Sequence, residues 1–145
     1  MYRPDTKKAL TLALKLIPWL NRRGYKVFTA SQQKLLPGTK FVKFANNPKD
    51  STKGKSLHLV IVLGGDGTYL RAVRFLKGAP IPILGVNLGS LGFLTETRAA
   101  NLFSTLTLAL KNKLLLKPRS MIEATIRRKG KEIATFNGLN DVVLA

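Results

Sequence analysis

The fold of this chain is decided by the stretch at residues 57–70, which reads LHLVIVLGGDGTYL. An apolar run rich in branched side chains leads into three glycines that surround Asp66, and an amphipathic helical pattern follows at once. This order predicts a strand buried on both faces, a tight turn and a helix. Open α/β sheets place their ligands beyond the carboxyl ends of such strands. We therefore expect a ligand site at this turn.

The composition of the turn suits a phosphorylated ligand. Glycines allow the backbone to approach a ligand closely, and the N-terminus of the following helix offers N–H groups and partial positive charge. The carboxylate of Asp66 would repel a phosphate unless it bound a metal or accepted a proton from a hydroxyl group. The dinucleotide-binding fingerprint fails, because it requires glycine or alanine where Leu70 stands. An ordinary strand–helix turn remains open at this point.

The segment before this stretch predicts a helix followed by a strand. Residues 6–23 carry apolar positions along one helical stripe, namely Leu10, Leu14, Ile17 and Leu20. Pro18 falls inside this pattern and should kink or divide the helix, and Gly24 should end it. Residues 25–30 read as a short strand. Because a doubly wound sheet normally opens with a strand, we expect the first strand of the fold to be missing from this chain.

The segment after the helix predicts a second strand, a glycine loop and another helix. Residues 81–86 form the next buried strand, and it leads into the glycine-rich loop at residues 87–93. Such a loop brings backbone close to a ligand, and Phe93 offers a flat face for a stacked base. Residues 98–111 form an amphipathic helix.

From residue 114 the apolar period changes from helical to alternating, which predicts a β-hairpin. The apolar face of a two-stranded hairpin needs a partner, and the few residues that follow can hardly supply one. We therefore expect an α/β nucleotide-binding domain with a parallel sheet and helices on both faces at residues 1–113. Residues 114–145 would be a hairpin and strand that open a β-rich second domain, most of which is absent.

Composition limits the class of protein and its partners. The 145 residues fit one domain, the 45% apolar fraction argues against disorder, and no cysteine is present for disulfides or thiolate metal sites. His58 stands alone, so no metal site is expected. No signal peptide or membrane span is evident, which makes a cytoplasmic protein the expectation. The net charge of +18 would attract phosphorylated small molecules and nucleic acid alike, without selecting among them.

Three motifs give a more specific indication. GGDGT at residues 64–68, GVNLGSLGFL at residues 85–94 and NDVV at residues 140–143 together resemble the NAD kinase family. The resemblance implies transfer of a terminal phosphate, from ATP or in some members polyphosphate, to the adenosine-ribose 2′-hydroxyl of NAD. It also implies a Rossmann-like parallel sheet that opens with a strand and is followed by a β-rich domain.

The resemblance carries over to individual residues. Asp66 would be the general base that accepts the 2′-hydroxyl proton. Asn140 and Asp141 would hydrogen-bond the nicotinamide-side ribose, and Phe93 would line the NAD site. The residues implied to contact NAD or the phosphates are Gly64, Gly65, Gly67, Thr68, Leu70, Arg74, Asn87, Phe93, Asn140 and Asp141. Mg²⁺ would arrive with ATP and not in a dedicated protein site.

The resemblance further implies a homo-oligomer without membrane association. It leaves open whether this polypeptide alone is active, because the family builds part of the NAD site from the later β domain and a neighbouring subunit. Lipid kinases of the diacylglycerol kinase type share the GGDGT turn and form one alternative, although their pattern continues with an Asn-Glu pair where Leu70 and Arg71 stand. The other alternative is a non-catalytic basic module that binds nucleotide or nucleic acid.

Overall fold

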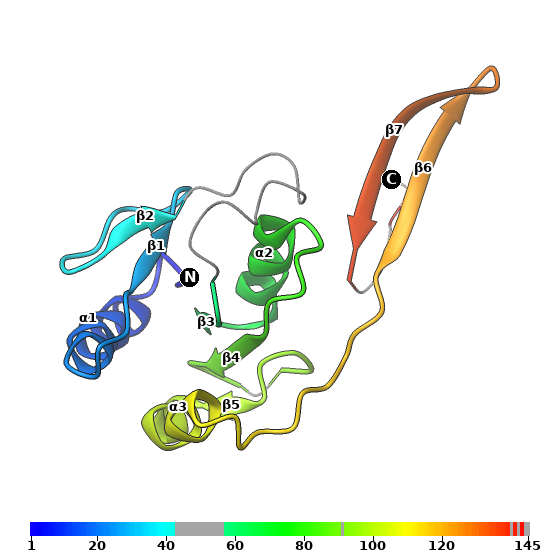
Figure 1. Cartoon of the computed structure of the whole chain (residues 1–145). Coiled ribbons are helices and arrows are strands. Elements are labelled where there is room, and N and C mark those ends of the chain that lie inside the picture. Colours follow the sequence, from blue (N-terminus) through cyan, green and yellow to red (C-terminus); the bar gives the residue numbers. More distant parts are fainter. Residues whose placement is uncertain (43–56, 91, 140, 142, 144–145) are drawn as a thin grey trace.

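The computed structural model describes residues 1–42, 57–90, 92–139, 141 and 143 (Figure 1). Its elements, in chain order, are α1 (Lys7–Asn21), β1 (Phe28–Ala30), β2 (Lys40–Val42), β3 (Val60–Leu63), α2 (Asp66–Leu76), β4 (Ile83–Asn87), β5 (Thr97–Arg98), the 3₁₀ helix η2 (Ala99–Asn101), α3 (Leu102–Leu110), β6 (Ile122–Arg128) and β7 (Lys131–Gly138). Up to α3 the described chain combines α-helices with strands that pair in parallel, which confirms the expected α/β class.

The strands before the hairpin form two parallel sheets among the described residues. One sheet pairs β1 with β2, and the other has the order β3-β4-β5. In the larger sheet, Val60 pairs with Ile83 and Leu63 pairs with Val86. Parallel neighbours need a crossover connection, and α2 supplies it between β3 and β4.

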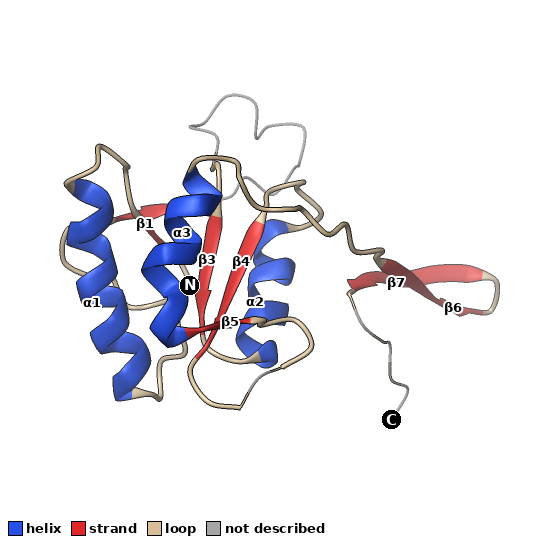
Figure 2. Cartoon of the chain, turned by 90° about the horizontal axis from the view of Figure 1, so that it is seen from below, coloured by secondary structure: helices blue, strands red, loops and turns tan. Residues whose placement is uncertain are grey.

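Strand β3 is covered on both faces, as its branched apolar run predicts. Val60 and Val62 pack in one core cluster with Phe75 of α2. Leu63 belongs to a second cluster that contains Leu16 of α1 and Leu106 of α3. Figure 2 shows α1 and α3 close to each other and α2 apart from them, so helices cover both faces as expected.

Helix α1 corrects two expectations. Pro18 lies inside the helix without dividing it, because Pro18 is on the exposed side and its carbonyl still accepts the Arg22 N–H group at 3.0 Å. The predicted apolar stripe is confirmed at Ile17 and Leu20 but is wrong at Leu10 and Leu14, which are exposed. The residues that face the core are Ala9, Ala13, Leu16, Ile17 and Leu20.

The first three residues run beside β3. The carbonyl of Met1 accepts the Leu63 N–H group at 2.9 Å, and the Arg3 N–H group donates to the Leu63 carbonyl at 2.9 Å. Tyr2 thereby forms a parallel bridge with Leu63. Met1, Tyr2 and Arg3 therefore lie beside the carboxyl end of β3.

Strands β6 and β7 form the predicted antiparallel hairpin, with a register shift between Ile126 and Arg127. Several of its large apolar side chains are exposed, among them Ile133 and Phe136. The assignment of residues 114–145 to a second, β-rich domain stays a prediction.

Candidate functional site

The candidate site lies at the carboxyl end of β3, where the chain enters α2. Gly65 is the N-cap, and its carbonyl accepts the N–H groups of Thr68 at 2.9 Å and Tyr69 at 3.1 Å. Helix α2 thus begins at Asp66, which is the only acidic residue of its first turn. The sequence placed Asp66 inside the turn, whereas the structure places it in the helix. A carboxylate at this position interacts favourably with the helix dipole.

The carboxylate of Asp66 is bound by the loop that follows β4. Its Oδ2 accepts the Phe93 N–H group at 2.9 Å, and its Oδ1 accepts the N–H groups of Leu94 at 3.2 Å and Thr95 at 3.1 Å. The Thr95 hydroxyl donates a further bond to Oδ1 at 2.9 Å. The glycine loop therefore turns its backbone donors toward Asp66, and the two motifs form one unit.

These bonds determine the ionisation of Asp66. Burial raises the pKa of the carboxyl group, but the Thr95 hydroxyl and the three backbone N–H groups outweigh this effect, so the pKa lies below its ordinary value. Asp66 is consequently ionised at neutral pH and is a weak base in this arrangement.

A buried polar chain supports Asp66 from behind. Thr95 is fully buried, and because its hydroxyl donates to Asp66, it accepts the Asn87 Nδ2 group at 2.9 Å. The Asn87 Oδ1 atom accepts the Gly89 N–H group at 2.7 Å. Asn87, expected to contact cofactor, therefore has its side chain directed into the protein. Thr95 was not predicted as a site residue, and its only signal is its position directly after the glycine loop.

Two glycines are required by close approach. A Cβ atom on Gly92 would lie 2.6 Å from Asp66 Cγ, and one on Gly64 would lie 2.8 Å from Thr68 Cβ. Real Cβ atoms essentially never come so close to another heavy atom. The glycines of both motifs thus leave room for the contacts between the loop and the first turn of α2.

A second group of predicted residues meets at a cavity of about 340 Å³ between α2 and the end of β7. Leu70 and Arg74 of α2 line this cavity together with Asp141 and Asn137. Asp66 is not among the lining residues, but it lies one helical turn before Leu70 and so on the same side of α2.

Phe93 and Gly67, two further predicted residues, do not line this cavity. Phe93 is 92% exposed, and Gly67 is exposed as well. Asn140 lies outside the described residues. The structure therefore brings Leu70, Arg74 and Asp141 together, and it ties Asp66 to the backbone of the loop that carries Phe93.

In the part of the chain that the structure describes, neither a metal-ligand cluster nor a membrane-spanning helix is found. No group of three or more His, Cys, Asp or Glu side chains is arranged there to hold a metal ion. His58, the single histidine, is exposed just before β3. None of the described helices has the length and apolar character needed to cross a bilayer.

A family model described as the ATP-NAD kinase N-terminal domain matches residues 1–114. The chain belongs to the NAD kinase family. It is 49% identical over 144 residues to the NAD kinase of Bdellovibrio bacteriovorus, covering 99% of this chain and 46% of that protein. It is 41% identical over 136 residues to the NAD kinase of Syntrophotalea carbinolica, covering 94% and 46%. The chain thus spans about half the length of these NAD kinases.

The fold is also similar to that of a solved structure. The crystal structure of yeast NADH kinase complexed with NADH matches with a TM-score of 0.68 and 18% sequence identity, covering 95% of this chain and 44% of that chain. This likeness confirms the α/β fold. The family match favours the NAD kinase interpretation of the GGDGT turn over the lipid kinase alternative.

Proposed function

We propose that the protein is a NAD kinase, which transfers a phosphoryl group from ATP or polyphosphate to the adenosine-ribose 2′-hydroxyl of NAD. The observation that carries this proposal is Asp66, which lies at the mouth of β3 and is bound by the second glycine motif. Ligands of open α/β sheets bind at this edge. The named NAD kinase relatives support the same chemistry.

In the proposed step, the 2′-oxygen forms a bond to the terminal phosphorus while the bond to ADP or to the shortened polyphosphate breaks. The 2′-hydroxyl proton passes to Asp66. The four hydrogen bonds that Asp66 accepts lower its pKa and so weaken it as a base. The bond from the Phe93 N–H group is the most exposed of the four, so a substrate hydroxyl would reach the carboxylate at this position.

Substrate binding is assigned to the surface that continues from Asp66 along α2. Leu70, Arg74 and Asp141 share the cavity beside β7, and one guanidinium with one carboxylate suits a ribose next to a pyrophosphate. The exposed ring of Phe93 is available to stack on adenine. Asn140 is assigned to the same ribose as Asp141 by its place in the NDVV motif.

Magnesium is assigned to the phosphates of ATP. The described residues offer no three-residue acidic or histidine cluster, whereas Mg²⁺ is commonly held by substrate phosphates with one or two carboxylates. When bound, it would offset the charge of the triphosphate. We assign the completion of the NAD site to residues beyond this chain, including those of a second subunit in a homo-oligomer.

The test replaces the matching half of the Bdellovibrio bacteriovorus NAD kinase with this chain, because the two are 49% identical over 144 residues. The graft should form NADP from NAD, ATP and Mg²⁺, and Asp66→Asn should reduce this rate by about 10²–10⁴-fold. The exposed carboxylate of Asp5 gives the matched control, Asp5→Asn, which should leave the rate unchanged. A well-folded graft that is inactive, or one that is indifferent to Asp66→Asn, contradicts the proposal. Polyphosphate in place of ATP identifies the donor.

The net charge of +18 favours one other function, that of a non-catalytic module for polyanions. Such a module would bind DNA or RNA as the 145-residue chain, with an affinity that falls steeply as the salt concentration rises. Nucleic-acid binding of this kind together with an inactive graft would replace the kinase proposal.

A further inference from the structure

A linker at residues 113–121 joins α3 to the hairpin and forms neither helix nor strand. Figures 1 and 2 show the hairpin beside the α/β part of the chain, at the end of this extended segment. Two apolar side chains of the linker face solvent, since Leu115 is 88% exposed and Leu116 is 69% exposed. Apolar burial along the linker therefore contributes little to the position of the hairpin.

Two cations of the linker meet one carboxylate of the α/β part. The Lys117 Nζ atom lies 3.0 Å from Glu96 Oε2 and 3.2 Å from Glu96 Oε1. The Arg119 Nη2 atom lies 3.7 Å from Oε1 of the same carboxylate. All three side chains are about half exposed. Glu96 therefore attaches the linker to the α/β part through two neighbouring cations.

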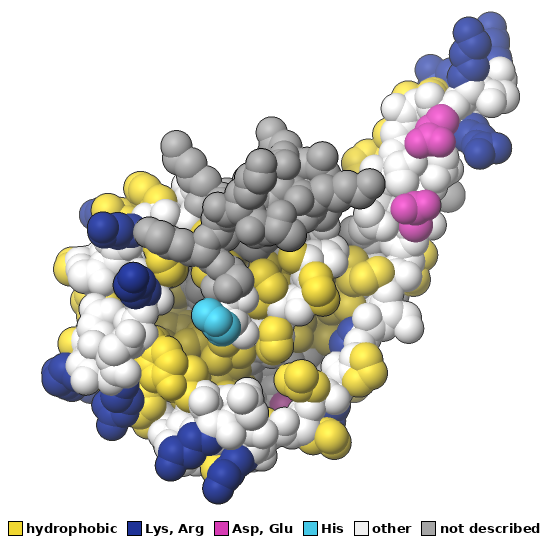
Figure 3. Space-filling view, viewed as in Figure 1, with side chains coloured by type: hydrophobic (Ala, Val, Ile, Leu, Met, Phe, Trp, Pro, Cys, Tyr) yellow, Lys and Arg dark blue, Asp and Glu magenta, His cyan; other side chains and the backbone are white. Residues whose placement is uncertain are grey.

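The charge of the two parts gives this attachment its importance. Basic residues outnumber acidic ones both up to residue 113 and from residue 114 onward. Figure 3 shows basic side chains at the tip of the hairpin and at several places on the α/β part. Because parts of like charge repel each other, the hairpin and the α/β part are not held together by their overall charge. The carboxylate of Glu96 provides a local attraction across this junction.

The backbone of Glu96 is held on both sides. The preceding residue, Thr95, is fully buried and donates its N–H group and its hydroxyl to the Asp66 carboxylate. The following residue, Thr97, begins β5 and pairs with Val86 of β4. The Glu96 side chain thus projects from a fixed position that is directly joined to the Asp66 network.

Tyr69 of α2 brings the ion pairs and the candidate site together. A Cβ atom on Gly85 would lie 3.0 Å from both Tyr69 Cδ2 and Thr95 Cγ2, so these two side chains pack against the same glycine. Burial raises the pKa of Tyr69, while the charge of Arg119 lowers it and that of Glu96 raises it, so the phenol lies within the field of both. The next residue of α2, Leu70, lines the cavity beside β7.

We propose that Glu96 is a positioning residue, which holds the linker through Lys117 and Arg119 and so sets where the end of β7 lies relative to Asp66. The inference rests on the proposed kinase function, because it treats the cavity lined by Arg74 and Asp141 as part of the NAD site. Without the ion pairs, NAD would have to restore the position of the hairpin when it binds. Binding of NAD should then weaken, whereas the chemical step at Asp66 should not change.

The first test uses the kinase graft, which contains the whole linker and hairpin of this chain. Glu96→Gln removes the charge but keeps the size of the side chain. Because exposed ion pairs are individually weak, KM for NAD should rise by about 5-fold, with kcat changed by less than about 2-fold. Glu96→Lys should raise KM further, since it places three cations together. Combining Glu96→Lys with Lys117→Glu restores an ion pair and should bring KM back to within about 2-fold of the original value.

The exposed Glu123 of β6 gives the matched control, because Glu123→Gln removes one negative charge and should leave KM and kcat unchanged. An active graft in which Glu96→Gln and Glu123→Gln have the same KM for NAD overturns this proposal and leaves the kinase function standing. A fall in kcat without a rise in KM also overturns it, because Glu96 would then act only through the Asp66 network.

A measurement without substrate covers an inactive graft. Because the chain has no cysteine, spin labels can be attached at Arg71→Cys of α2 and Lys131→Cys of the hairpin. The distribution of distances between the labels should broaden with Glu96→Gln, stay unchanged with Glu123→Gln and narrow again in the charge-swapped chain. Equal distributions in all these chains overturn the role of Glu96. A broadened distribution beside an inactive graft supports that role and contradicts the kinase function alone.

Discussion

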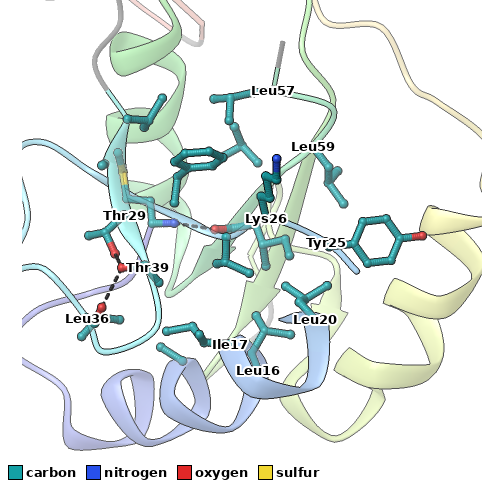
Figure 4. A pocket seen from close by; sticks show the side chains of 18 of the residues that line it. Leu16, Ile17, Leu20, Tyr25, Lys26, Thr29, Leu36, Thr39, Leu57 and Leu59 are labelled. Atoms are coloured by element: carbon teal, nitrogen blue, oxygen red, sulfur yellow. Dashed lines mark hydrogen bonds between the residues drawn. The ribbon is translucent and has the colours of Figure 1, made fainter. Parts of the chain in front are cut away.

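Strand β3 has two edges that differ in almost every respect. On the β4 side the ladder runs from Val60 to Leu63, and it ends in a closed polar network around Asp66. On the β1 side Met1, Tyr2 and Arg3 are the described residues that bond to the strand, and an apolar cavity lies beside the remainder (Figure 4). One strand thus supports the candidate chemistry along one edge and borders an apolar cavity along the other.

Because the two edges of β3 differ, substitutions on the two sides should have different consequences. No buried side-chain nitrogen or oxygen among the described residues lacks a hydrogen-bond partner, so the polar network of the β4 side is complete. Changes there should alter the geometry of Asp66 as well as stability. Changes on the β1 side should alter stability without touching the Asp66 network.

The largest expected effect on stability belongs to the β1 side and depends on pH. In a chain with a free amino group at Met1, burial lowers the pKa of that group from the usual 8.0 to about 5. Between these values the unfolded chain binds more protons than the folded chain, so stability should rise as pH goes from 5 to 8. The free energy of unfolding should increase over this range by at most about 4 kcal/mol.

Acetylation of the Met1 amino group is the matched control for this prediction. It removes the charge but keeps an N–H group for the Ile61 carbonyl, so the dependence over this range should disappear. Urea unfolding at several pH values measures both forms. The low pKa of Asp66 acts in a different range, since it stabilises the fold above the ordinary carboxyl pKa and is lost as pH falls through the folded value. Equal pH profiles for the free and acetylated chains would contradict the assignment.

On the β4 side, Gly92→Ala should have the largest effect. The new Cβ would lie 2.6 Å from Asp66 Cγ, and the displaced loop would lose its bonds to the carboxylate. We expect a loss of about 3 kcal/mol in the free energy of unfolding and a lower rate in the grafted kinase. Gly89→Ala is the control, because its Cβ would approach nothing closer than 4.0 Å. Similar losses for the two variants would show that loop flexibility, not the contact with Asp66, matters.

Thr95→Val should have a smaller effect on stability, and it tests the hydrogen bonds of the Thr95 hydroxyl separately from the shape of the side chain. Valine keeps the shape of the side chain but leaves Asn87 Nδ2 without its acceptor and removes one donor to Asp66. The expected loss is about 2 kcal/mol. The pKa of Asp66 should move up, which shifts the acid limb of the activity profile of the graft toward higher pH. Thr11→Val, on the exposed side of α1, should change neither quantity.

The same comparison shows what the sequence could predict. The apolar run before Gly64 and the helical pattern after it are sufficient to predict β3 and the helix that follows, because burial on two faces leaves a continuous apolar run. The bond from Thr95 to Asp66 could not be read in this way. It joins residues 29 positions apart, and it depends on how the glycine loop folds back over α2.

Errors along α1 have a related cause. Apolar residues occupy many positions of this helix, so their spacing alone could not distinguish Ala9 and Ala13, which are buried, from Leu10, which is exposed. The cavity between β1 and β3 could not be predicted either, because it depends on the register of the strands in both sheets.

The smallest expected effect tests the mouth of the cavity. Gln33→Leu keeps an apolar stem of similar length but removes both bonds to the Tyr2 backbone, which should cost about 1 kcal/mol in the free energy of unfolding. The adjacent and exposed Gln32 gives the control, since Gln32→Leu should have no measurable effect on unfolding in urea. The rate of the graft should be unchanged in both variants. If Gln33→Leu lowered that rate as strongly as Thr95→Val, the two edges of β3 would be coupled, and the division between chemistry and packing drawn from them would be wrong.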